Sequence, residues 1–161
     1  EFIRDPETDI VKVAVVERHQ GTGNVACGFL KGYGIREGAV ALSVAHDSHN
    51  IIVVGVSDEE MEFAVNSLIA QEGGIVLVKE GKVIESMPMP IAGLMSDQSG
   101  EWVDQKLTDI HEKAYSELGI SGEVEPVMTL CFMSLAVIPE VKLTDMGLFD
   151  VTTFSFISTE A

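Results

Sequence analysis

Two short, almost wholly apolar segments separated by four polar residues constrain the fold of this chain more than any other feature. The segments AVALSVA (39–45) and NIIVVGV (50–56) flank His46-Asp47-Ser48-His49. Apolar runs of this length, bounded by polar residues, are typical of buried strands. We therefore predict two largely buried strands, joined by a polar segment that contains two of the four histidines in the chain.

Other segments indicate further strands and one region of tight turns. The valine-rich segment 9–18 is typical of a strand, and 75–86 predicts a hairpin that turns at Glu80-Gly81. Residues 20–38 contain six glycines, so we expect a loop-rich or tightly turning region there. Near the other end of the chain, 142–151 predicts a turn and 152–159 a terminal strand.

Two segments have the residue spacing of amphipathic helices. The first follows Ser57, which we expect to cap a helix while Glu60 reaches back in a capping box. The second runs from about Ser99 to Leu118 and ends at Gly119. The predicted inward-facing residues are Met61, Ala64, Val65, Leu68 and Ile69 in the first helix, and Val103, Leu107, Ile110, Ala114 and Leu118 in the second.

The order of these elements predicts the fold class. The apolar segment 126–140 is a buried helix or a buried strand, and periodicity does not decide which. We expect a single α+β domain over residues 1–161, in which a mixed, largely antiparallel sheet packs with two amphipathic helices.

Composition indicates a partner and excludes some classes of partner. Hydrophobic residues make up 46% of the chain and the mean hydropathy is +0.25, so we expect apolar surface buried against a missing domain, another chain or a second copy in a homo-oligomer. A net charge of −16 argues against nucleic acid and anionic membrane as partners. The uncharged segment 127–138 is too short to span a bilayer, and no signal peptide is visible, so we expect a cytoplasmic protein.

The two cysteines and the first residue lead to two further expectations. Cys27 and Cys131 lie in apolar surroundings without CxxC spacing, and we expect two buried free thiols. The chain begins with Glu1 rather than Met, and we expect a piece of a longer protein.

The segment 46–50 is the main candidate for chemistry, and a metal site is one interpretation. His46 and His49 with Asp47 could supply two or three ligands, whereas a closed site usually takes four. His19 and His111 are the only further histidines, and His111 adjoins the apolar stripe of the second predicted helix. We therefore expect no complete metal site within this chain.

Three other interpretations of the polar residues remain. Ser48 could be a nucleophile beside His49, but neighbours on an extended segment point to opposite faces, and the chain has no GxSxG motif. The glycine-rich segment 21–28 matches neither a P-loop nor a dinucleotide fingerprint. Residues 46–50 could also form a polar turn whose side chains hydrogen-bond to their own backbone, or a substrate-facing loop.

Five segments together resemble a known family. In order, they are ERHQGTGN (17–24), GFLKGYGI (28–35), GAVALSVAHDSHNIIVVG (38–55), MPIAGLMSD (89–97) and VIPEVKLTDMGLFDV (137–151). They resemble the C-terminal domain of bacterial and archaeal adenine deaminases of the amidohydrolase superfamily. The resemblance covers nearly the whole chain.

The resemblance implies a function and a missing catalytic part. Enzymes of this family hydrolyse adenine to hypoxanthine and ammonia, using a divalent metal (manganese or iron) held in an N-terminal barrel that opens with a His-x-His pair. No such pair occurs here, so we expect that the barrel is absent, that this chain holds no metal and that it does not deaminate adenine alone.

The resemblance also implies a role for the polar segment. We expect His46, Asp47, Ser48, His49 and Asn50 to form a loop that closes over the active site of the barrel, with Arg18 and His19 as weaker substrate-binding candidates. A surface salt bridge is the alternative for Arg18 and His19. For the whole chain, the alternative is a non-catalytic binding or oligomerisation module.

Overall fold

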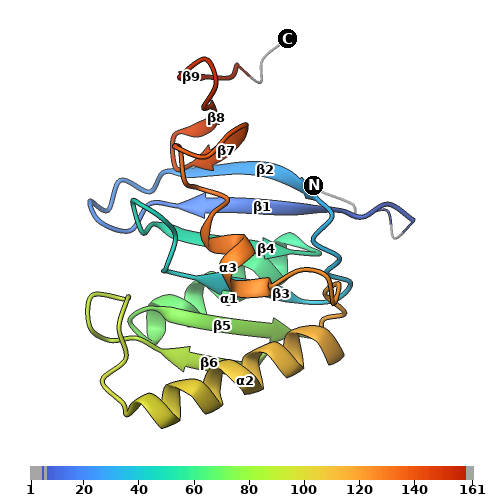
Figure 1. Cartoon of the computed structure of the whole chain (residues 1–161), viewed down its shortest axis with the longest axis vertical. Helices are drawn as coiled ribbons and strands as arrows, with labels where there is room; N and C mark the ends of the chain where they lie inside the picture. The colour runs from blue at the N-terminus through green and yellow to red at the C-terminus, as the bar shows by residue number, and fades with distance from the viewer. Residues whose placement is uncertain (1–4, 6, 159–161) are drawn as a thin grey trace.

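A six-stranded antiparallel sheet forms the centre of the computed structural model, which describes residues 5 and 7–158 (Figure 1). In spatial order its strands are β2 (Val25–Lys31), β1 (Ile10–Val16), β4 (Ile51–Gly55), β3 (Ala39–Leu42), β5 (Gly74–Lys79) and β6 (Lys82–Pro88). Neighbouring strands pair antiparallel. Together with the helices, the sheet confirms the predicted α+β fold class.

Helices cover both faces of the sheet. On one face, α1 (Asp58–Ala70) packs against β3, β4 and β5. On the other face lie α2 (Gly100–Ser116), which packs against β6, and α3 (Pro126–Cys131), which packs against β4 (Figure 1). All residues of β3 and β4 are buried, which explains why their sequences are continuously apolar rather than alternating.

The two long helices begin and end near the predicted residues. Ser57 caps α1 by accepting a hydrogen bond from the Glu60 amide at 3.2 Å. The Glu60 carboxylate accepts a hydrogen bond from the Gly81 amide instead of returning to Ser57, so only half of the predicted capping box forms. Ser99 caps α2 in the same way, through the Trp102 amide at 3.3 Å.

Packing confirms most of the predicted helix stripes. The α1 residues Met61, Ala64 and Leu68 are buried, while Ile69 is exposed. In and just after α2, the buried residues are Ile110, Ala114 and Leu118, and Val103 and Leu107 pack against the same core.

The prediction of a loop over 20–38 was wrong in its middle, where β2 pairs with β1 along its whole length. Gly28 lies inside this strand, where a Cβ would meet Leu148 and Leu143 at 3.6 and 3.7 Å. The high glycine content therefore led to the prediction of turns where the structure has an edge strand. Cys27 in β2 is exposed and free, contrary to the expectation of burial, whereas Cys131 is buried and free.

A second, smaller sheet lies beyond β2 (Figure 1). It consists of β7 (Val141–Thr144), β8 (Gly147–Asp150) and β9 (Ser155–Phe156). The predicted turn at 142–151 is thus a hairpin, because the two short strands pair with each other. Among the described residues, we find no helix with the length and apolar character needed to cross a bilayer.

Candidate functional site

Three loops meet at one end of the central sheet. We call residues 46–49, which join β3 to β4, the HDSH loop. In the antiparallel pairing of β1 with β4, Val16 lies opposite Ile51. Continuing this register by two residues brings Arg18, after β1, beside His49, before β4. The third loop follows β6 and contains Ala92 and Gly93.

Arg18 joins all three loops. Its Nε donates a hydrogen bond to the His49 carbonyl at 2.5 Å, and its Nη2 donates to the Ala92 carbonyl at 2.9 Å. Its backbone amide donates to Asn50 Oδ1 at 3.3 Å. At Gly93, a Cβ would lie 2.7 Å from Nη1 of Arg18, so a side chain there would displace the guanidinium. Neither Arg18 nor His19 forms an ion pair with the described residues.

His19 supports the HDSH loop from the same turn as Arg18. Its Nε2 hydrogen-bonds to the Ser48 carbonyl at 2.7 Å. The turn itself is held by Glu17, whose carboxylate accepts hydrogen bonds from the amides of Thr22, Gln20 and His19. These bonds, with that from Thr22 the largest contribution, lower the pKa of Glu17 to about 2.

The α3 region holds the other side of the HDSH loop. The His46 amide donates to the Cys131 carbonyl at 3.0 Å, and Ser134 Oγ donates to the His46 carbonyl at 3.2 Å. The His46 ring stacks on Phe132 with ring centroids 5.2 Å apart, and its centroid lies 5.3 Å from that of His49. Imidazoles that come from one loop are thus brought together over an aromatic side chain.

The side chains of the HDSH loop do not serve its own backbone. Within the described part of the chain, no hydrogen bond joins the side chain of His46, Asp47, Ser48 or His49 to any backbone group. The Nδ1 of His49 is buried and has no hydrogen-bond partner in the same part of the chain. A polar turn would use these groups for its own support, so this arrangement disfavours the polar-turn interpretation.

The surroundings of His49 favour its neutral imidazole. Burial lowers its pKa below the ordinary histidine value, and the charges of His46 and Arg18 act in the same direction. A histidine with a pKa lowered from 6.5 is mostly uncharged at neutral pH, so its ring can both donate and accept a hydrogen bond.

A surface pocket of about 480 Å³ lies beside the loop. It is bounded by parts of all three loops and by the turn after α1: Arg18, His19, Ser48, His49, Glu72, Pro90, Ala92, Gly93 and Leu94. The structure therefore brings Arg18 and His19 together with Ser48 and His49, whereas His46 and Asp47 do not line this pocket. Asn50 is buried and serves as a hydrogen-bond acceptor for Arg18 rather than facing the pocket.

Two chemical interpretations have no support in this geometry. Among the described residues, no three His, Cys, Asp or Glu side chains cluster closely enough to hold a metal ion. His111 bonds to Glu125 at the contact between α2 and the start of α3. The nucleophile interpretation requires a hydrogen bond between Ser48 Oγ and a histidine. Among the described residues, no such bond is present.

Some residues of the site were missed in the sequence. Ser43 Oγ donates to the Gly93 carbonyl at 2.5 Å and accepts from the Gly74 amide at 2.8 Å, which fixes the third loop against β3 and β5. Phe132 and Ser134 support His46 from a segment more than eighty residues away in sequence. In the sequence, the glycines at 73, 74 and 93 were the signal that backbone segments approach one another closely here. All three have positive φ in the structure.

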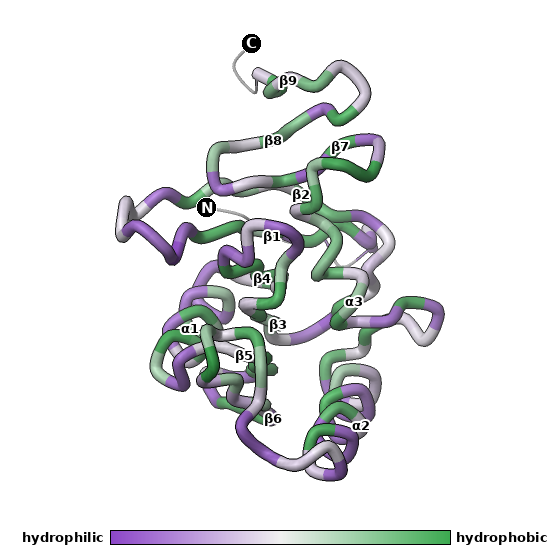
Figure 2. The backbone as a smooth tube through the Cα atoms, turned by 60° about the vertical axis from the view of Figure 1, so that its left-hand side comes forward, coloured by the Kyte–Doolittle hydropathy of each residue, from purple (hydrophilic) through white to green (hydrophobic). Residues whose placement is uncertain are grey.

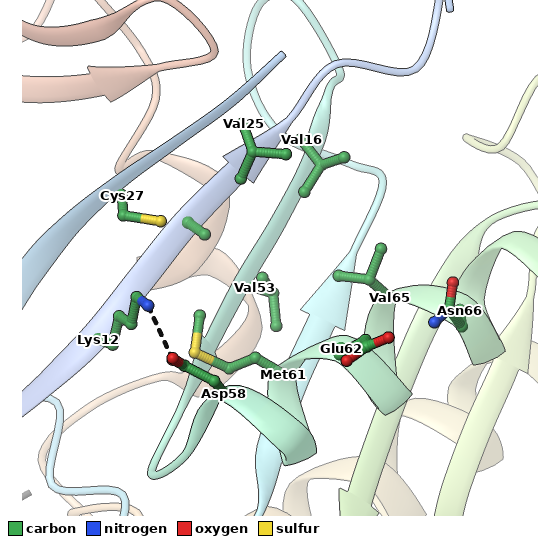
Figure 3. Close-up of a pocket in the computed structure, with 11 residues that line it drawn as sticks. Lys12, Val16, Val25, Cys27, Val53, Asp58, Met61, Glu62, Val65 and Asn66 are labelled. Atoms are coloured by element: carbon green, nitrogen blue, oxygen red, sulfur yellow. Dashed lines mark hydrogen bonds and ion pairs between the residues drawn. The ribbon is translucent and has the colours of Figure 1, made fainter. Parts of the chain in front are cut away.

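A second pocket lies on the α1 face of the sheet (Figure 3). This groove of about 360 Å³ runs between the β1–β2 pair and α1 and is lined mainly by aliphatic side chains, among them Val16, Val25 and Val65. Its charged pair, Lys12 and Asp58, is already joined at 2.7 Å. No residue of the HDSH loop lines it. We refer to it as the α1 groove.

Comparison with known proteins identifies the family. Residues 1–155 match the model of the adenine deaminase C-terminal domain. The chain is 72% identical over its full length to adenine deaminase 2 of Desulfotalea psychrophila, and covers 28% of that protein. It is 49% identical over 158 residues to adenine deaminase of Bacillus subtilis, covering 98% of this chain and 27% of that protein. The chain therefore belongs to the adenine deaminase C-terminal domain family.

Proposed function

We propose that this chain is the C-terminal part of an enzyme that hydrolyses adenine to hypoxanthine and ammonia in cytoplasmic purine salvage. We further propose that the HDSH loop completes the active site of that enzyme. Family membership and the names of the relatives support the reaction. Because the chain spans little more than a quarter of those relatives, the remaining part of the parent enzyme would supply the main catalytic groups.

The proposed role of the loop rests on one observation: other residues hold its backbone, while its own side chains do not. Arg18, His19, Cys131 and Ser134 satisfy its backbone groups. His46 Nδ1 and Asp47 Oδ1 lie 3.9 Å apart, and among the described residues neither of these side chains nor the His49 imidazole is used to hold the backbone of the loop. Unpaired buried polar atoms such as His49 Nδ1 cost stability, and functional sites commonly contain them.

The chemistry of these groups suits a purine. The ring nitrogens and amino group of adenine present both acceptors and donors, and a neutral imidazole offers one of each. His49 can therefore hydrogen-bond to the base, while His46 offers a partly exposed ring for stacking or proton movement. A loop that closes over the base also excludes water from the reaction.

The described residues of this chain do not form a metal site. We propose that the divalent ion, manganese or iron, which supplies the activated water, is held by the part of the parent enzyme outside this chain. The contribution of this chain would then be to position the base and to shield it, without a metal ligand of its own.

Truncation of the complete enzyme tests the proposal. We would compare the complete parent enzyme, the same enzyme without residues 1–161, and this chain alone, each with added manganese, by loss of adenine absorbance. We expect turnover by the complete enzyme, a fall of about 100-fold or more without this region, and none by the chain alone. Full turnover by the shortened enzyme would instead favour a binding or oligomerisation module. Failure of the folded complete enzyme to act on adenine would refute the substrate.

A further inference from the structure

Exposed apolar side chains gather on the small sheet, at the end of the molecule beyond β2. Figure 2 shows green, hydrophobic stretches along β7, β8 and β9, where they project beyond β2 (Figure 1). Met146 and Phe154 are 71% and 76% exposed, respectively. We call this the β7–β9 surface, and its exposed apolar residues are Val137, Ile138, Val141, Met146, Phe154, Phe156 and Ile157. Val137, at 67% exposure, was expected to be buried.

Local contacts order this surface. Asp150 Oδ1 accepts hydrogen bonds from the amide and hydroxyl of Thr152, at 2.8 and 2.6 Å, and from the amide of Thr153 at 3.2 Å. The ring of Phe149 packs edge-to-face against both Phe154 and Phe156, with centroids 5.2 Å apart in each case. These contacts restrict the rotamers of the exposed rings, which reduces the side-chain entropy lost when a partner binds.

The β7–β9 surface is continuous with the HDSH loop. Both line one groove of about 330 Å³, with Asp47 and Ser48 on one side and Met146, Phe149 and Phe156 on the other. A partner that fills this groove therefore contacts both the HDSH loop and the β7–β9 surface. The α1 groove has no such connection, because none of its lining residues belongs to the loop or to the small sheet.

We infer that the β7–β9 surface is the docking site for the catalytic part of the parent enzyme, which would present apolar side chains with basic residues around them. This inference rests on the proposed function. This chain covers only 28% of the relative from Desulfotalea psychrophila, so a large further part of such an enzyme is available to cover the surface.

Charge disfavours a second copy of this chain as the occupant. Asp47 and Asp145 line the groove, Asp150 lies at the end of β8, and the chain carries a net charge of −16. Two such surfaces in contact would place these carboxylates close together, which is unfavourable. A partner with basic residues at the rim would pair with them instead.

Hydrogen–deuterium exchange tests the docking site without relying on turnover. We would compare the complete parent enzyme with this chain alone. We expect amides of residues 146–157 to exchange about tenfold or more slowly in the complete enzyme, and those of β2 to exchange at the same rate in both. Equal rates at 146–157 would overturn the inference. So would protection that rises with concentration in the isolated chain, because that result identifies a second copy.

A matched pair of variants separates docking from folding. Phe154→Asp changes an exposed ring on the β7–β9 surface, and Val25→Asp changes an exposed apolar side chain, 55% exposed, on β2. In the complete enzyme we expect the first to abolish the protection and the second to retain it, with similar melting of both isolated variants. Equal protection in both would contradict the inference. If residues 146–157 are not protected but HDSH-loop variants are inactive, the docking inference fails and the proposed function stands. If these residues are protected but HDSH-loop variants are fully active, the proposed role of the loop fails and the docking inference stands.

Discussion

Arg18 links the three loops of the candidate site through a geometry that lysine does not offer. Its guanidinium donates from Nε to one loop and from Nη2 to another, at 2.5 and 2.9 Å. These donors are separated within a rigid plane, whereas a lysine presents a single point of charge on a flexible stem. The position of the HDSH loop therefore depends on the shape of the side chain at 18 as well as on its charge.

Replacing Arg18 by lysine should loosen this site. We expect Arg18→Lys to lower the free energy of unfolding by about 1–3 kcal/mol, since at least one hydrogen bond from a charged donor to a backbone carbonyl is lost. The measurement is urea unfolding of the purified chain. Lys82→Arg, at an exposed position, is the control and should change stability by less than about 0.5 kcal/mol. Equal effects of the two variants would mean that Arg18 does not hold the loops.

At the scale of elements, α2 is fixed to the edge of the sheet by one carboxylate. Glu85 in β6 accepts hydrogen bonds from Lys106 and Lys113 of α2, at 2.7 and 3.0 Å. Burial acts to raise the pKa of Glu85, but the hydrogen bonds from the two lysines outweigh it, and the pKa is lowered. The charged carboxylate thus stabilises the docking of this helix.

The lowered pKa predicts a dependence of stability on pH. The contribution of Glu85 is fully present above the pKa of an unfolded glutamate, about 4.3, and is lost as pH falls through the lower folded value. We expect Glu85→Gln to cost about 1–3 kcal/mol at pH 7, and this difference to shrink at and below about pH 4. Chemical unfolding at several pH values measures it.

Glu37 provides the control for that measurement. It pairs with Lys79 at 2.5 Å, but its side chain is largely exposed. An exposed ion pair contributes little to stability, so Glu37→Gln should change stability much less than Glu85→Gln. If the two variants behave alike at pH 7, the pairing of Glu85 with α2 does not contribute as proposed.

Elements with strong local signals could be predicted from the sequence. The strands β3 and β4, the β5–β6 hairpin and helices α1 and α2 lie where periodicity, caps and turn residues place them. The strand β2 was missed because its pairing with β1 is a tertiary contact, and six glycines around it indicated turns. The β7–β8 hairpin was missed because its strands are only four residues each.

The candidate site could be predicted only in part. The unusual composition of residues 46–49 predicts a functional loop, with Arg18 and His19 as weaker candidates beside it. That Arg18 reaches His49 follows from the register of β1 with β4, which no local pattern specifies. The exposure of Cys27 and Val137 was missed for a related reason, since burial depends on which elements cover a segment.

At the scale of the whole molecule, the polar HDSH loop and the apolar β7–β9 surface lie next to each other. The HDSH loop and the β7–β9 surface share a groove, so a single partner can contact both. The central claim is that this loop contributes to catalysis in the parent enzyme and is more than a connection between strands. A test must therefore separate turnover from stability in the same preparations.

The most direct test measures adenine turnover and melting temperature for HDSH-loop variants of the complete enzyme. His49→Asn suits the loop because the φ of residue 49 is 54°, which asparagine tolerates, and Asp47→Asn removes only the charge. His111→Asn is the control, since His111 bonds to Glu125 away from the loop. We expect turnover to fall by about 100-fold in His49→Asn and measurably in Asp47→Asn, with little change in melting, and to persist in His111→Asn. Turnover near that of the unaltered enzyme, or a fall only in step with stability, would contradict the account and leave the loop as a polar turn.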